Sequence, residues 1–351
     1  MSKAHELLAE INKTLGAGTL ILGNDKRLEV SYIPTGIFPI DHLLGGGIPK
    51  GRFTELFGAY STLKSYIGLS AIAQCQKQGG VCAIIDTEHA YDPEWATNLG
   101  VDTETLIYQS PQTGEEAIDV AEVLIRNGID LIVWDSIAAT VPQAESIKRM
   151  SKESVQPARL AALMSTGLRK LTSANQHTAV LFINQTRINV GVMFGDPEVV
   201  AGGKALPYYA SFRVALRKAG KVKESVDGFD EIGHKIKTNK VLGIKIKATL
   251  EKSKLSAPST ETLFTFDLQT GSVDEIGYLI AGGLTQEIIK HEGRSWWVEN
   301  SEKSVGIETF RKYLEQNPKI QEMIRQSLLP QQTSLGVSEQ GKSKVGSRKK
   351  K

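Results

Sequence analysis

Short apolar segments that alternate with helical stretches, from Arg52 to about Arg217, are the feature that most constrains the fold of this 351-residue chain. Apolar strands are predicted at Phe53–Phe57, Val81–Ile85, Leu131–Trp134, Val180–Ile183 and Phe212–Leu216. Helices are predicted between them at Tyr66–Gln76, Glu115–Arg126 and Arg159–Leu171. Short, continuously apolar strands separated by helices are typical of a mostly parallel sheet covered on both faces. The sequence therefore predicts an α/β fold with a mostly parallel central sheet.

The regions on either side of this alternation have patterns of their own. A short helix is predicted within residues 1–20, from the helical spacing of Leu7, Leu8, Ile11 and Leu15. Residues 235–267 alternate apolar and polar side chains, which indicates antiparallel strands at the edge of the sheet. Beyond Thr270 the pattern becomes that of a small α+β unit whose last two helices are separated at Asn317-Pro318. The remaining residues are rich in Ser, Gly, Gln and Lys, which predicts a disordered tail.

Charge and cysteine content limit where such a chain works. The formal net charge is +3, but the residues from Gln331 onward carry +5 and the rest of the chain carries −2. No run of 18 apolar residues occurs, and Met1–Leu20 lacks the pattern of a signal peptide, so a membrane partner is not expected. Cys75 and Cys82 have no CxxC spacing and no neighbouring His. They are predicted to be buried thiols in a cytoplasmic protein, not a disulfide or a zinc site.

The first predicted strand runs directly into a candidate phosphate-binding loop. Gly58 is followed by four residues and then by Leu63-Lys64-Ser65, which opens a helix. In this motif, G-x-x-x-x-G-K-[ST], backbone N–H groups face the phosphates, the Lys reaches the β/γ oxygens and the Ser hydroxyl binds Mg²⁺. Leu63 stands where the motif has Gly, and a left-handed Leu costs roughly 1–2 kcal/mol. From the motif alone, a working loop and an eroded one remain equally open.

Three further strand ends carry polar side chains that suit the same site. Asp135 ends an apolar strand and is placed to hold Mg²⁺ through water. Glu88 follows another strand and is placed to orient or activate a water at the γ-phosphate, while Gln185 follows a third and could sense that phosphate. Ligands of open parallel sheets bind at the carboxyl edge of the strands, so these residues should meet there. A long Gly-bearing loop follows Gln185, and loops of this length are usually functional or disordered.

The chain resembles the bacterial RecA recombinase family over roughly residues 1–330. The matching segments, in order, are TGIFPIDHLLGGGIPKGR, FGAYSTLKS, IIDTEHAYDPEWATNLGV, LIVWDSIAATVPQAE, LFINQTRINVGVMFGDPE, GGKALPYYASFRVALRK and EKSKLSAPS. The resemblance implies a RecA-type P-loop ATPase core with a short N-terminal helix/strand element and a small α+β C-terminal domain. The implied division is a polymerisation element (1–32), the ATPase core (33–269), the C-terminal domain (270–329) and a disordered basic tail (330–351).

The resemblance also implies a nucleotide site, with ATP and Mg²⁺ as cofactors. Lys64, Glu88 and Gln185 match catalytic positions of the family, and Ser65 and Asp135 match its metal ligands. The implied nucleotide-binding set is Gly58, Ala59, Tyr60, Ser61, Thr62, Leu63, Lys64, Ser65, Tyr66, Asp92, Trp95, Asp135, Lys252 and Lys254. In the family, the residues matching Asp92 and Trp95 contact and stack the adenine. Those matching Lys252 and Lys254 reach the ATP of the neighbouring protomer.

Two loops that line the filament axis carry the DNA contacts implied by the resemblance. They span about 145–157 and 187–203. The implied DNA-binding residues are Arg169, Arg187, Val190, Gly202, Gly203, Arg217 and Lys218. Cationic groups would track phosphates, while an apolar tip such as Val190 enters stretched base steps.

Several positions depart from the family's pattern. Leu63 replaces the loop Gly, as in some viral members, and with the C-terminal Lys run it favours a phage-encoded source. Pro207 stands where a family lysine acts near the subunit interface. Val199, Val200 and Ala201 replace residues that usually carry hydroxyl groups.

The first functional hypothesis is therefore an ATP-dependent homologous recombination protein, a DNA-dependent ATPase that forms filaments on single-stranded DNA and exchanges it with a homologous duplex. Its expected partners are those DNAs, further copies of itself, and single-strand-binding and loader proteins. The alternative is a DNA-binding filament scaffold or recombination mediator with a degenerate loop, which Leu63 favours. A hexameric helicase motor is a third hypothesis, against which the match of both DNA loops counts.

Overall fold

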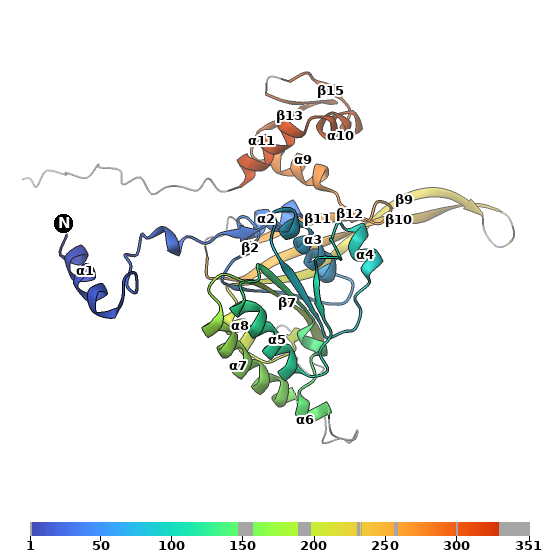
Figure 1. Cartoon of the computed structure of the whole chain (residues 1–351). Coiled ribbons are helices and arrows are strands. Elements are labelled where there is room, and N and C mark those ends of the chain that lie inside the picture. Colours follow the sequence, from blue (N-terminus) through green and yellow to red (C-terminus); the bar gives the residue numbers. More distant parts are fainter. Residues whose placement is uncertain are drawn as a thin grey trace, which may run out of the picture. The chain divides into compact units, whose positions relative to one another are not determined.

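The computed structural model describes residues 2–146, 157–188, 198–229, 232, 234–255, 259–299 and 301–329 (Figure 1). Most of the first predicted DNA loop, the central part of the second with Val190, and the predicted tail lie outside the described residues. The chain divides into two compact units, residues 1–275 and 276–351.

The first unit contains a sheet in which, among the described residues, ten strands take part. The strand order is β12-β11-β10-β9-β3-β7-β6-β4-β5, and β8 pairs with β7. The parallel strands are β3 (Phe53–Gly58), β4 (Cys82–Asp86), β5 (Ile107–Gln109), β6 (Leu131–Asp135), β7 (Ala179–Ile188) and β9 (Phe212–Phe229). The antiparallel strands are β8 (Glu198–Val200), β10 (Lys235–Ser253), β11 (Glu261–Asp267) and β12 (Ser272–Val273). The predicted α/β fold with a mostly parallel sheet and an antiparallel edge is confirmed.

Helices pack against this sheet and connect its strands. They are α2 (Phe38–Leu44), α3 (Lys64–Lys77), α4 (Pro93–Asn98), α5 (Gly114–Arg126), α6 (Gln143–Ser146), α7 (Pro157–Ala174) and α8 (Ala205–Tyr209), with 3-10 turns at Lys26–Leu28 and Ile137–Ala139. The predicted helices lie within α3, α5 and α7. The N-terminal helix is also confirmed as α1 (Lys3–Leu15), but the strand of that element is only β1 (Tyr32–Ile33), paired with β2 (Ile48–Pro49).

Large buried side chains hold the sheet against α5 and α7. Trp134 and Phe182 are fully buried with ring centroids 5.7 Å apart, and Phe53 meets Phe182 edge-on at 5.5 Å. The buried indole N–H of Trp134 donates to the Thr140 hydroxyl at 3.3 Å. This core holds the carboxyl ends of β3, β4, β6 and β7 in register, which places their terminal side chains at one edge of the sheet.

The second unit is a small α+β structure, as its sequence pattern predicted. It contains α9 (Glu275–Thr285, whose first residue belongs to the first unit), β13 (Ile289–Glu292), β14 (Ser295–Val298), β15 (Ser304–Val305), α10 (Ile307–Gln316) and α11 (Pro318–Leu328). Phe310, Leu314, Ile324 and Leu328 are its buried apolar side chains from the last two helices. In the part of the chain that is described, no helix is both long and apolar enough to span a membrane.

One carboxyl in the first unit makes stability depend on pH. The carboxylate of Asp41, on α2, accepts the backbone N–H of Thr35 at 2.7 Å. Burial, together with repulsion from Glu275, raises its pKa to about 7 despite hydrogen bonds from Thr35 and Gly36. In the unfolded chain the pKa returns to about 3.9. Between these values the native state binds more protons than the unfolded state, so protonation stabilises the fold.

We expect the free energy of unfolding to fall as the pH rises from about 4 to about 7, with no further contribution from Asp41 above that range. Ionisation of Asp41 should lower the free energy of unfolding by up to about 4 kcal/mol over this range. The Asp41→Asn variant should lose this part of the slope, because its side chain does not ionise. Urea unfolding across this pH range, followed by tryptophan fluorescence, measures the slope in both proteins. An identical slope in both proteins would contradict the assignment to Asp41.

Candidate nucleotide site and nucleic-acid interface

The loop between β3 and α3 has the geometry of a phosphate-binding loop. Gly58 ends β3 so close to β9 that an added Cβ would lie 2.2 Å from the carbonyl oxygen of Leu216, so only Gly fits. The loop closes at Leu63, whose φ of 69° and ψ of 16° are left-handed, and α3 begins at Lys64. Leu63 thus adopts the conformation for which the motif uses Gly, at a cost of roughly 1–2 kcal/mol.

The left-handed conformation of residue 63 should reverse the usual order of stability of Gly and Ala variants. We expect Leu63→Gly to be more stable than Leu63→Ala by about 1 kcal/mol, because Gly alone adopts positive φ freely. In an ordinary helix or strand Ala is the more stable residue of the two. Urea unfolding of the two variants measures the difference. A more stable Ala variant would show that the left-handed turn is not kept in solution.

The Lys64 side chain lies inside the curve of this loop. Its ammonium donates to the carbonyl oxygens of Gly58 at 3.1 Å and Ala59 at 2.8 Å. Burial lowers its pKa, while the nearby carboxylates of Asp135 and Glu88 act in the opposite direction. The cation is therefore held at the loop by weak carbonyl partners, which phosphate oxygens can replace.

The first turn of α3 faces the end of β6. The Ser65 hydroxyl donates to the Asp135 carboxylate at 2.5 Å. Burial first, and then repulsion from Glu88 and Asp86, raises the pKa of Asp135 to about 6. Among the described residues, no three His, Cys, Asp or Glu side chains could hold a metal ion by themselves. A hydroxyl beside one carboxylate suits Mg²⁺, which takes most of its other ligands from phosphates and water.

Glu88, at the end of one strand, contacts side chains from the ends of two others. It follows β4, and its Oε1 accepts hydrogen bonds from the Ser136 hydroxyl, after β6, and from the Gln185 amide of β7 at 2.5 Å. Two donors therefore fix one carboxylate oxygen. The sequence identified Glu88 and Gln185 as candidates, but it gave Ser136 no role. The one available signal was its place directly after Asp135.

A pocket of about 280 Å³ joins these groups to the predicted adenine contacts. Its lining residues include Ser65, Glu88, Asp92, Trp95 and Asp135. Asp92 also caps α4, since its carboxylate accepts the N–H groups of Glu94 and Trp95 at 2.9 and 3.2 Å. The Trp95 side chain is 40% exposed, which leaves its ring accessible to a base.

Other predicted nucleotide-binding side chains have different surroundings. The Tyr66 ring packs edge-on against Phe266, with centroids 5.1 Å apart, so its contribution would come from its backbone N–H. Tyr60 is exposed, and the Lys218 ammonium lies 5.0 Å from the centre of its ring. The Thr62 hydroxyl donates to the Ala59 carbonyl at 2.8 Å and so stabilises the loop itself. Ser61, the last of the predicted nucleotide-binding residues in this loop, has positive φ, as Leu63 does.

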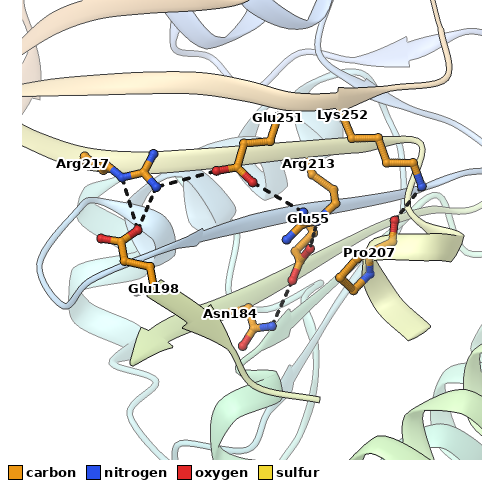
Figure 2. Close-up of polar contacts among 8 residues, drawn as sticks. All are labelled: Glu55, Asn184, Glu198, Pro207, Arg213, Arg217, Glu251 and Lys252. Atoms are coloured by element: carbon orange, nitrogen blue, oxygen red, sulfur yellow. Dashed lines mark hydrogen bonds and ion pairs between the residues drawn. The ribbon is translucent and has the colours of Figure 1, made fainter. Parts of the chain in front are cut away.

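Lys252 and Lys254 lie at the C-terminal end of α8. Lys252 donates to the carbonyl oxygen of Pro207 at 2.5 Å (Figure 2). It also donates to that of Tyr208 at 2.8 Å, and Lys254 donates to the same oxygen at 3.0 Å. Cations are favourable at this end of a helix. Neither lysine lines the pocket that holds Glu88, so the structure does not bring them to the nucleotide site of their own chain.

A buried polar network connects the phosphate-loop strand with the strands beside it (Figure 2). Glu55, in the middle of β3, is fully buried and accepts hydrogen bonds from Arg213 at 2.6 Å and Asn184 at 2.9 Å. The Asn184 amide also donates to the carbonyl of Ala201, at 3.0 Å, and its oxygen accepts the N–H of Gln185. Sequence reasoning missed this network. Its only signal was one charged residue inside the apolar run FTELF.

The predicted DNA-binding side chains fall into two groups. Arg217 is paired with the carboxylates of Glu198 at 2.8 Å and Glu251 at 3.7 Å. Arg169 and Arg187 are exposed. Gly202 and Gly203 have φ of +83° and +72°, and with Arg187 they line a pocket of about 590 Å³ between the described ends of the two predicted DNA loops.

Comparisons with known proteins agree on one family. The model of the RecA N-terminal domain family matches residues 3–265. A protein of Saccharopolyspora erythraea named Protein RecA is 40% identical over 344 residues, covering 96% of this chain and 94% of its own. Proteins of the same name from Nocardia farcinica and Mycobacteroides abscessus are 41% and 42% identical, covering 93% and 90% of this chain and 91% and 88% of their own. The chain therefore belongs to the bacterial RecA family, whose members act in DNA recombination and repair.

Proposed function

We propose that this protein is a DNA-dependent ATPase that forms filaments on single-stranded DNA and pairs it with a homologous duplex. The observation that carries the proposal is the convergence of Ser136 and Gln185 on one oxygen of Glu88, in the same pocket as Ser65 and Asp135. A carboxylate fixed by two donors beside a phosphate-binding loop is suited to orient an attacking water and accept its proton.

The roles of the chain's own residues follow from these contacts. Lys64 exchanges the loop carbonyls for the β/γ-phosphate oxygens of ATP, and its charge offsets theirs. Ser65 and Asp135 hold Mg²⁺, which when bound neutralises phosphate charge. Asp92 and Trp95 contact the base. Glu88 orients the attacking water and takes its proton.

Gln185 connects this chemistry to DNA. Its amide donates to Glu88, while its strand β7 continues to Ile188, at the start of the second predicted DNA loop. A γ-phosphate oxygen would compete with Glu88 for that amide donor. The start of the loop would then differ between the ATP-bound and ATP-free states. The proposed DNA contacts of this region are Arg187, Val190, Gly202, Gly203, Arg217 and Lys218. Arg169 on α7 is a further proposed contact.

The proposed division of the chain remains that of the sequence: a polymerisation element in residues 1–32, the core in 33–269, a C-terminal domain in 270–329 and a basic tail. Lys252 and Lys254 are proposed to act on the ATP of a neighbouring protomer, because they do not reach the pocket of their own. No observation favours the non-hydrolysing scaffold, since Leu63 keeps the left-handed turn that the loop needs.

Phosphate release by the purified protein, with and without single-stranded DNA, tests the proposal. We expect hydrolysis to need Mg²⁺ and to increase when the DNA is added. Electron microscopy of the same samples should show filaments on the single strand in the presence of ATP. Absence of DNA-stimulated hydrolysis would overturn the enzymatic part of the proposal.

A further inference from the structure

Strands β9 and β10 continue as a pair past the strands that flank them. β3 pairs with β9 only at Phe212–Leu216, and β11 pairs with β10 only between Gly243 and Thr249. Beyond these limits the two strands pair only with each other among the described residues, and Figure 1 shows them running out from the sheet. We call residues 221–229 and 235–241 the β-ribbon. An isolated two-stranded hairpin is only marginally stable in water, so the β-ribbon adds little to the stability of the fold, and stability does not explain why it is so long.

Strand register divides the β-ribbon into two different faces. Paired residues share a face, and so do residues two apart on one strand. The pairs Lys237↔Asp227, Val241↔Lys223 and Ile244↔Lys221 place four lysines on one face: Lys221, Lys223, Lys235 and Lys237. The same face carries Ser225, Asp227 and Asn239, and we call it the lysine face. The opposite face carries Val222, Glu224, Val226, Thr238 and Lys240.

The lysine face is exposed and has an excess of positive charge. All four lysines are exposed, and none of them forms an ion pair with another residue that the structure describes. Four cations against the single anion Asp227 leave three uncompensated charges on this face, whereas Lys240 and Glu224 balance on the other. Like charges gathered on one face of a ribbon destabilise it, unless an anionic partner covers them.

We propose that the β-ribbon docks on double-stranded DNA through its lysine face. The proposal rests on the proposed function, because the duplex is the second DNA that such a filament must bring in. Lysines two apart on a strand are about 7 Å from each other, and a two-stranded ribbon fits the major groove, where its cations reach the phosphates on either side. Lys218, nearer the sheet on the same strand β9, pairs with Ile246, two residues from Ile244, and so continues the lysine face toward the proposed DNA contacts.

The composition of the lysine face favours a duplex over a single strand. Single-strand sites combine cations with aromatic side chains on which bases stack. The β-ribbon contains one aromatic residue, Phe229 at the end of β9, and the lysines otherwise alternate with Ser, Asp, Asn and Val. A row of point cations is instead suited to a regular phosphate backbone.

A pair of matched double variants tests the proposal. Lys235→Gln/Lys237→Gln removes two charges from the lysine face. Lys240→Gln/Lys245→Gln removes one charge from the opposite face of the β-ribbon and one from Lys245, which pairs with Gly220 where that opposite face continues into the sheet. Filaments of each protein, assembled with ATP on an unlabelled single strand, are titrated with a fluorescent duplex of unrelated sequence at several salt concentrations. Fluorescence anisotropy measures the duplex affinity.

We expect the lysine-face variant to lose about tenfold in duplex affinity, and its log–log salt slope to fall by about two, since each phosphate contact contributes about 0.9. The opposite-face variant should change by less than about twofold. Equal losses in both variants, or no loss in either, would overturn the proposal.

Phosphate release stimulated by single-stranded DNA is measured on the same preparations. A wild-type protein without that activity would refute the proposed function. A wild-type protein that hydrolyses ATP and assembles, beside a lysine-face variant with undiminished duplex affinity, would refute the β-ribbon proposal alone.

Discussion

Replacing Glu88 by glutamine is expected to slow DNA-stimulated ATP hydrolysis at least about a hundredfold, because general-base catalysis contributes 10²–10⁴-fold. A glutamine oxygen still accepts hydrogen bonds from Ser136 and Gln185, so the local geometry is kept, but an amide does not take a proton from water. Binding of ATP and its effect on DNA affinity should therefore remain. Phosphate release gives the rate, and anisotropy of a labelled single strand gives the binding.

Glu94 supplies a matched control for that substitution. It lies on α4 close to Asp92, is exposed and does not line the pocket. The Glu94→Gln variant makes the same chemical change and should hydrolyse ATP at the wild-type rate. If Glu88→Gln turned over as fast as wild type while binding DNA normally, Glu88 would not be the catalytic carboxylate.

Replacing Arg213 by methionine is expected to destabilise the fold by about 3–5 kcal/mol. Arg213 donates to the fully buried carboxylate of Glu55 at 2.6 Å, and its loss leaves a buried charge to which, among the described residues, Asn184 remains as donor (Figure 2). Methionine keeps the apolar stem of the side chain, although it loses the guanidinium that lies 4.6 Å from the centre of the Phe57 ring. The loss of stability should therefore come mainly from the unpaired carboxylate of Glu55 and less from lost packing. Urea unfolding measures it.

Two comparisons separate the buried charge from ordinary surface effects. The double variant Glu55→Gln/Arg213→Met removes the charge as well as its partner, and should recover a large part of the lost stability. Lys247→Met breaks an exposed ion pair with Glu261, at 2.7 Å, and should cost less than about 1 kcal/mol. A double variant no more stable than Arg213→Met would show that the buried charge is not the cause.

Elements with strong local patterns were predictable, and weakly patterned ones were not. The apolar runs of β3, β4 and β6 were placed to within a residue or two, because continuous burial leaves a clear trace in composition. Edge strand β5 was missed since its residues Ile107 and Tyr108 are exposed. The short helices α4 and α8 were missed as well, because one or two turns give too few residues for a periodic signal.

The sequence by itself determined which chemical groups stand at the strand ends: Lys64 and Ser65, Glu88, Asp135 and Gln185. In a parallel sheet the carboxyl ends share one edge, so strand order alone brings these residues together. Only the tertiary structure decided which of them touch. The bond from Ser136 to Glu88 and the burial of Glu55 beside Arg213 depend on the register between strands far apart in sequence, and the single lysine face of the β-ribbon depends on the register between two consecutive strands. A shift of one residue would turn each side chain to the opposite face, and no local pattern fixes that choice.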